Sequence, residues 1–179
     1  MGFLDSIMRG LRLIRLDATA AVEIAQDTGS TVYGWIIIIV AALLFALLPY
    51  VPPYVIPFDA KVFLITIVGY VIFAASSILI FHGLAKLFGG QSRLLEYIRA
   101  QSHVLLLNWL LVFNIIGIPF NTLLWLIAIW NIVVTIVIIK SLHKLNTWRA
   151  IIVTLLLPVI SVVLSLVIGA LASFRYIKF

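Results

Sequence analysis

Long apolar stretches, separated by short polar clusters, make up most of this chain. A helix needs roughly 20 consecutive apolar residues to cross the hydrocarbon core of a bilayer, which is about 30 Å thick. No charged residue lies between Asp27 and Asp59 or between Lys61 and Lys86, and each of these stretches is long enough to cross. The pattern therefore predicts an all-α fold, a polytopic membrane helix bundle of five transmembrane helices behind an amphipathic N-terminal helix. The predicted spans cover about 31–49, 62–86, 102–117, 121–139 and 149–173, which makes 1–27 a juxtamembrane segment and 28–179 a membrane domain.

The third and fourth spans share one charge-free stretch, between Arg99 and Lys140. A single straight helix over this stretch would be about 60 Å long, twice the thickness of the hydrocarbon core. The chain must therefore fold back on itself, and the Gly-Ile-Pro sequence at 117–119 supplies the break. Asn121 and Thr122 are expected to cap the helix that follows.

Polar side chains on the two arms of this hairpin are expected to face each other. Gln101 and Asn108 share one face of the first arm, and Asn131 and Thr135 share one face of the second. A turn near Ile118 brings Asn108 to the depth of Asn131 and brings Gln101 close to Thr135. Hydrogen bonds between helices in a membrane contribute about 0.6 kcal/mol each. We expect these four residues to hold the hairpin together and to perform no chemistry.

The fifth predicted span opens at Asn146 and Thr147. Pro158 is expected to kink it, because proline removes a backbone hydrogen bond from a helix. A small residue recurs at every fourth position in its second half, and such a stripe lets another helix approach closely. That partner helix belongs either to the same chain or to another subunit. The stripe consists of Ser161, Ser165, Gly169 and Ser173.

Basic residues gather in the N-terminal segment and in the loops after the second and fourth predicted spans. Cytoplasmic loops of membrane proteins carry an excess of Lys and Arg. With five spans these three segments lie on one side, so we expect the N-terminus in the cytoplasm and the C-terminus outside, although Arg175 and Lys178 run against the rule. This topology rests on Arg9, Arg12, Arg15, Lys86, Arg93, Arg99, Lys140, Lys144 and Arg149.

The N-terminal segment has the pattern of an amphipathic helix. At 100° per residue its apolar residues share one face and its charged residues share the other. Such a helix is expected to lie in the membrane interface, where Arg9, Arg12 and Arg15 would attract anionic lipid headgroups by about 1 kcal/mol each. The alternative is a helix that packs on the cytoplasmic ends of the bundle. Residues 17–26 are expected to form a second short helix. The apolar face holds Phe3, Leu4, Ile7, Leu11 and Ile14, and the opposite face holds Asp5, Arg9 and Arg12.

Composition narrows the possible functions. About 65% of the residues are hydrophobic and 10% are charged, which is typical of a membrane protein. The net charge is +6, but the basic residues form no patch with interleaved aromatics, so we expect no nucleic-acid partner. There is no cysteine, and no Asp or Glu lies within a predicted span. His82, His103 and His143 fall near the ends of spans, where we read them as polar ends at the headgroup level. We expect no catalytic residue, no metal site and no cofactor.

Four motifs, in order along the chain, resemble those of the Ypt-interacting-protein (Yip) domain family. They are Val22–Thr31 before the first span, Gly83–Gly90 after the second, Ile116–Pro119 between the third and fourth, and Leu145–Ala150 at the start of the fifth. The resemblance is to the prokaryotic branch, and it implies five spans in a plasma membrane with a cytoplasmic N-terminus. Eukaryotic members bind Rab-type small GTPases and carry a longer N-terminal domain that is missing here. GTPase binding is therefore not expected of this chain.

These features predict a non-enzymatic integral membrane protein that acts as a scaffold or adaptor in membrane organisation or a trafficking-like process. Its partners would be the bilayer and anionic lipid headgroups. One alternative is an accessory subunit of a larger membrane complex, docked through the small-residue stripe. Another is a channel or transporter for a small solute, for which the only polar path would use His82, Asn108, Asn114 and Asn131.

Overall fold

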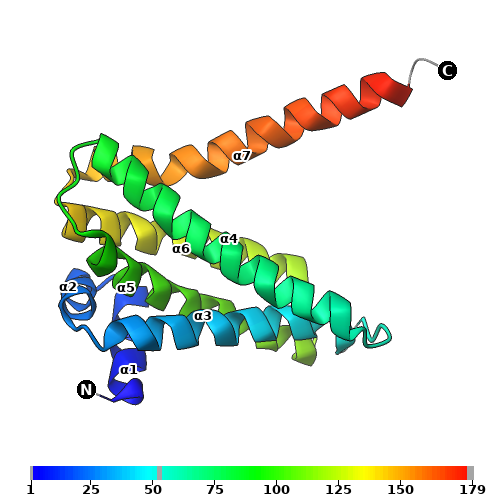
Figure 1. Cartoon of the computed structure of the whole chain (residues 1–179), viewed down its shortest axis with the longest axis horizontal. Helices are drawn as coiled ribbons and strands as arrows, with labels where there is room; N and C mark the ends of the chain where they lie inside the picture. Colours follow the sequence, from blue (N-terminus) through cyan, green and yellow to red (C-terminus); the bar gives the residue numbers. More distant parts are fainter. Residues whose placement is uncertain (1, 52–53, 177–179) are drawn as a thin grey trace.

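The computed structural model describes the backbone of residues 2–51 and 54–176, and the side chains of these residues as far as Val163. Every regular element in the described chain is helical (Figure 1). The helices are α1 (Phe3–Ile14), α2 (Ala18–Gln26), α3 (Ser30–Leu47), η1 (Leu48–Tyr50), α4 (Ala60–Leu87), α5 (Leu94–Val104), η2 (Leu105–Ile116), α6 (Phe120–His143) and α7 (Thr147–Tyr176), where η denotes a 3₁₀ helix.

Among the residues that the structure describes in full, three helical segments are long and apolar enough to cross a membrane. They are α3 continued by η1, then α4 and α6, and in Figure 1 each runs between the same two ends of the bundle, with α4 inclined to α3. The short helices α1 and α2 lie together near one end of this bundle, and α7 leaves the bundle from that same end and diverges from it. The loops before α5 and α7 share the end where α2 lies, and the loop after η1 lies at the opposite end.

A polar side chain caps the start of α4, whereas the start of α6 differs from the one expected. The side chain of Asp59 accepts hydrogen bonds from the backbone N–H groups of Lys61 and Val62, at 2.8 and 3.1 Å, and so caps α4. The expected cap of α6 is wrong. This helix begins at Phe120, because extended Pro119 already takes the N-cap position and its carbonyl accepts the N–H of Leu123. Asn121 and Thr122, the expected caps, therefore lie exposed in the first turn.

The third predicted span differs from one continuous α-helix. It contains only the last three residues of α5, which begins eight residues earlier at Leu94, and then the 3₁₀ helix η2, which is followed by Gly117 in the left-handed conformation (φ +93°). A 3₁₀ helix rises about 2.0 Å per residue, so η2 covers about 24 Å. The break expected at Gly117 is thus present, and the segment before it is longer and thinner than a regular α-helix of the same residues.

Candidate functional site

α1 turns its small and polar side toward the protein. Its buried residues are Ser6, Arg9, Gly10 and Leu13. The opposite side is apolar and exposed, with exposed fractions of 75% for Leu4, 62% for Met8 and 41% for Leu11. The apolar face is divided, because Phe3, Ile7 and Ile14 are half-buried and Ile14 packs against the core, whereas Leu4, Met8 and Leu11 point outward. Polar groups of the bundle also contact the buried side of α1.

Ser6 is one of those polar contacts. Its hydroxyl lies 2.6 Å from Nε2 of His103, and Nδ1 of the same ring lies 2.7 Å from the carbonyl oxygen of Arg99. A carbonyl can only accept, so Nδ1 carries the proton, and Nε2 accepts the hydroxyl proton of Ser6. Both Ser6 and His103 are fully buried. This chain of two hydrogen bonds fixes α1 to α5.

The C-terminal end of α1 reaches the side of α6. The indole Nε1 of Trp130 donates a hydrogen bond of 2.9 Å to the carbonyl oxygen of Ile14. Trp130 lies well inside α6 and not at either of its ends. Figure 1 shows α1 crossing the direction of the long helices instead of extending them. α1 thus lies across the flank of the bundle, with its apolar side turned outward.

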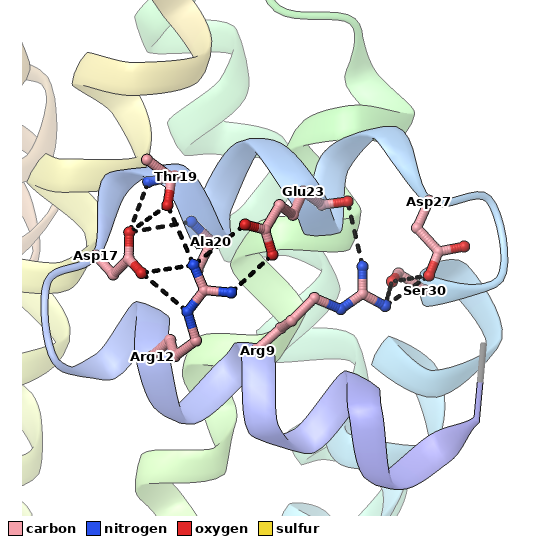
Figure 2. Close-up of polar contacts among 8 residues, drawn as sticks. All are labelled: Arg9, Arg12, Asp17, Thr19, Ala20, Glu23, Asp27 and Ser30. Carbon is pink, nitrogen blue, oxygen red and sulfur yellow. Dashed lines mark hydrogen bonds and ion pairs between the residues drawn. The ribbon is translucent and has the colours of Figure 1, made fainter.

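Arg9 forms a buried junction between α1, α2 and α3 (Figure 2). Its Nη2 lies 2.6 Å from Oδ2 of Asp27 and 3.4 Å from Oγ of Ser30, and Nη1 donates to the carbonyl oxygen of Glu23 at 3.3 Å. The side chains of Arg9 and Asp27 are 6% and 22% exposed. The hydrogen bond from Arg9 lowers the pKa of Asp27 below its ordinary value. Arg9 is therefore occupied within the protein and does not face lipid headgroups as the sequence had suggested.

Arg12 and Arg15 have different surroundings. Arg12 bridges α1 to α2, with Nη2 2.7 Å from Asp17 and Nη1 2.9 Å from Glu23, in an exposed position. Figure 2 shows its guanidinium turned toward α2, as that of Arg9 is. Arg15 is exposed. The membrane-surface role predicted for the three arginines does not fit buried Arg9, and it stays a prediction for the exposed Arg12 and Arg15.

The pKa of Asp17 offers a direct test of the hydrogen bonds that this N-cap residue accepts at the start of α2. A hydrogen bond from the hydroxyl of Thr19, followed by those from Arg12, lowers this pKa to about 2 from its ordinary 3.8. The folded-state pKa is the lower one, so the stabilisation is present above about pH 4 and is lost as the pH falls toward 2. We expect Thr19→Val to raise the pKa of Asp17 toward 3.8, measured by carboxyl NMR titration. Thr28→Val, in the exposed turn after α2, should leave it unchanged, and an unchanged pKa in Thr19→Val would contradict the assignment.

Arg99 contributes a link that the sequence did not indicate. Its Nε donates to Oγ1 of Thr31 and its Nη1 donates to the carbonyl oxygen of Ala25, both at 2.8 Å. The sequence pattern assigned Arg99 only to the loop charges that set topology. Its position in the first helical turns after a loop gave no signal of these partners, because they lie far away in the sequence. Arg99 ties α5 to the end of α2 and the start of α3.

The polar residues of the hairpin are brought together. Nε2 of Gln101 donates to Oγ1 of Thr135 at 2.9 Å, and Nδ2 of Asn131 lies 3.5 Å from Oδ1 of Asn108. Asn108 also donates to the hydroxyl of Tyr70, a residue of α4 that the sequence had not singled out. Two facing polar pairs therefore join α6 to α5 and η2, and Tyr70 extends the second pair to α4.

The remaining candidates are spread over the bundle. The rings of His82, His143 and Tyr97 pack against one another at tilted or edge-to-face angles, with centroids 5.0 Å apart between the histidines and 5.2 Å apart between His143 and Tyr97. In the described residues no three His, Cys, Asp or Glu side chains gather in a way that would hold a metal ion. Asn114 donates to the carbonyl oxygen of Ile118 and so closes the turn after η2.

Most of the small-residue stripe of α7 falls outside the described side chains. The hydroxyl of Ser161 donates to the carbonyl oxygen of Leu157 within the same helix, at 2.9 Å. Ser165, Gly169 and Ser173 lie where the structure gives the backbone and no side chains, so the packing role predicted for the stripe stays a prediction.

Comparison with known proteins returned no relative. No protein family, curated protein or solved structure matches this chain.

Proposed function

We propose that this chain is a five-span integral membrane protein that organises the bilayer by holding an amphipathic helix in one leaflet. The five spans are α3, α4, η2 with the end of α5, α6 and α7, with the N-terminus in the cytoplasm. The protein is a non-enzymatic scaffold in this proposal. Membership of the Yip domain family, proposed from the four sequence motifs, agrees with the same number of spans and the same orientation.

One observation carries the proposal. α1 exposes Leu4, Met8 and Leu11 while it buries Arg9 and Ser6. In water such an apolar face would be unfavourable by about 25 cal/mol for each Å² exposed. In the headgroup and acyl boundary of a leaflet the same face is favourable. Arg15 follows α1 on the same side as Leu11, one turn later, where its long side chain would reach anionic phosphates.

The contacts of α1 hold it rigidly against the bundle, so in this proposal it is inserted in the leaflet at a fixed position. A 12-residue helix is about 18 Å long and about 10 Å wide. Arg9 and Arg12 fasten α1 to α2, and Trp130 fastens its last turn to α6. A helix of this size in one leaflet and absent from the other expands that leaflet, so the protein would favour membranes whose cytoplasmic leaflet is convex.

Curvature sorting of the full chain tests the proposal. We expect the fluorescently labelled protein, reconstituted in giant vesicles containing anionic lipid, to be enriched severalfold on thin tubes pulled from them over the flat membrane. This expectation applies to molecules whose α1 lies in the outer leaflet, because the outer leaflet of a tube is the convex one. The triple variant Leu4→Ser, Met8→Ser and Leu11→Ser should lose this enrichment, because its outward face no longer enters the leaflet.

The absence of cysteine provides the control. A single nitroxide attached through Met8→Cys should be accessible to oxygen and shielded from a water-soluble nickel complex. A nitroxide attached through Gln26→Cys, on the exposed side of α2, should show the reverse. Equal sorting of the wild type and the triple variant, or a water-exposed label at position 8, would refute the proposed role of α1.

A further inference from the structure

A cavity of about 400 Å³ lies between α4, α5, α6 and α7. Its inner wall is the polar set of the hairpin, with Gln101, Asn108, Asn131 and Thr135 all lining it together with Tyr70. Ligand sites in proteins typically have volumes of roughly 300–1,000 Å³. None of the described residues that line the cavity carries a formal charge. The cavity is therefore of ligand size, and its polar groups are amides and hydroxyls.

Gln101 has an unused acceptor in this wall. Its side-chain nitrogen donates to Thr135, while Oε1 is buried without a hydrogen-bond partner. The residue is 8% exposed. A buried carbonyl oxygen without a donor is unfavourable, and such groups commonly mark a site for water or a ligand. An occupant that donates a hydrogen bond to Oε1 would remove this penalty.

The cavity opens toward the surroundings of the bundle at the middle of α4. Phe73, Ser76 and Ile80 of α4 are exposed and line it, and Leu157 and Pro158 line it from α7. Figure 1 shows α7 diverging from α4 along its length. In the proposed membrane placement this opening faces hydrocarbon, because the middle of a spanning helix lies at the middle of the bilayer. An occupant would enter from the lipid phase.

A second cavity of about 480 Å³ adjoins the first and shares Tyr70, Phe73, Asn108 and Asn131 with it. Its other walls are mainly apolar and include Phe45, Leu111, Leu124 and Ile127. Hydrocarbon fits such walls, whereas a small polar solute would lose its hydration without compensation. The two cavities are therefore neighbours with a common wall, and the one beside Gln101 has more polar groups than the one beside Leu111 and Ile127.

We propose that the first cavity binds an uncharged, hydroxyl-bearing lipid, whose hydroxyl donates a hydrogen bond to Oε1 of Gln101 and whose chain passes Phe73, which lines both cavities, to reach the apolar second cavity. A phosphate or ammonium headgroup does not fit, because the described lining offers no opposite charge to pair with it. This inference shares with the proposed scaffold function only the membrane placement, and α1 takes no part in it.

Photocrosslinking on the full chain tests the site. The protein is reconstituted in phosphatidylcholine vesicles with a trace of diacylglycerol that carries a diazirine in one acyl chain, or of phosphatidylcholine that carries the same group. We expect diacylglycerol to label the segments around Tyr70 and Ile127 about tenfold more than the phosphatidylcholine probe does. Gln101→Leu should lower that labelling about tenfold, as expected for the loss of one buried hydrogen bond.

Two further variants make the result decisive. Gln91→Leu makes the same chemical change in an exposed loop and should leave labelling at the wild-type level. Ser76→Trp fills the opening from an exposed position and should abolish labelling even if Gln101→Leu fails to fold. Equal labelling by the two probes, or unchanged labelling in Ser76→Trp, would overturn the proposal. Curvature sorting would be unaffected by either outcome, so this failure is distinct from a failure of the scaffold function.

Discussion

Arg9→Met is expected to destabilise the attachment of α1 by about 2 kcal/mol. The substitution removes the cationic partner of Asp27 and the donor to the carbonyl of Glu23, and it leaves a mostly buried carboxylate that keeps only the hydrogen bonds from Gly29 and Ser30. Removing one member of a buried ion pair typically costs 3–5 kcal/mol, and the partial exposure of Asp27 reduces this value. Native-state hydrogen exchange in detergent or nanodiscs would report the change as protection of α1 and α2 amides that falls about 30-fold.

Two comparisons identify the cause of this loss. Arg15→Met removes the same charge from an exposed position on α1 and should change protection little, within about 0.5 kcal/mol. The double variant Arg9→Met, Asp27→Asn should recover part of the loss, because the uncompensated charge is gone. If Arg9→Met exchanged like the wild type, the junction of α1, α2 and α3 would not depend on this ion pair.

Gly90→Ala is expected to destabilise the whole bundle by about 2 kcal/mol. A Cβ at this position would lie 2.7 Å from the backbone carbonyl oxygen of Ala85 and 2.9 Å from Cγ of the His143 ring. His143 is fully buried, and the carbonyl of Ala85 accepts the N–H of Gly90 itself, so neither neighbour can move freely. Overpacking of this kind typically costs 1–3 kcal/mol. Unfolding by SDS titration in mixed micelles, followed by tryptophan fluorescence, measures the difference.

Gly83→Ala is the matched control for this glycine. Apart from the nearby backbone of its own helix, no described atom lies within 4 Å of a Cβ built at Gly83, which is in the interior of α4. Alanine favours a helix over glycine by about 1 kcal/mol, so this variant should be as stable as the wild type or more so. Equal stability of Gly90→Ala and Gly83→Ala would show that the loop at Gly90 relaxes away from His143.

Much of the helical framework could be predicted from the sequence. Apolar stretches bounded by charges located α3, α4 and α6, and Asp59 and Gly117 marked boundaries that the structure also has. These features are local, because an apolar stretch and a cap act through residues within one or two turns. The hairpin polar pairs were also predictable, since a turn at a known position fixes which residues lie at the same depth.

The orientation of α1 was not predictable in this way. Its sequence shows an apolar face and a charged face, and either face could have been placed inward. The partners of the inward face, among them Asp27 and His103, lie on other elements of the chain. A helical pattern gives the angle between two faces and does not say which face meets the protein.

The sequence by itself therefore determined that this is a helical chain with long apolar helices, and it fixed where most of them begin and end. The tertiary structure decided that Arg9 is buried, that Gln101 keeps a free acceptor and that a cavity opens beside it. The physical reason is the distance along the sequence between the residues that interact. Helix formation depends on neighbours a few residues apart, whereas the burial of a charge and the shape of a cavity depend on residues that come together only after the helices pack.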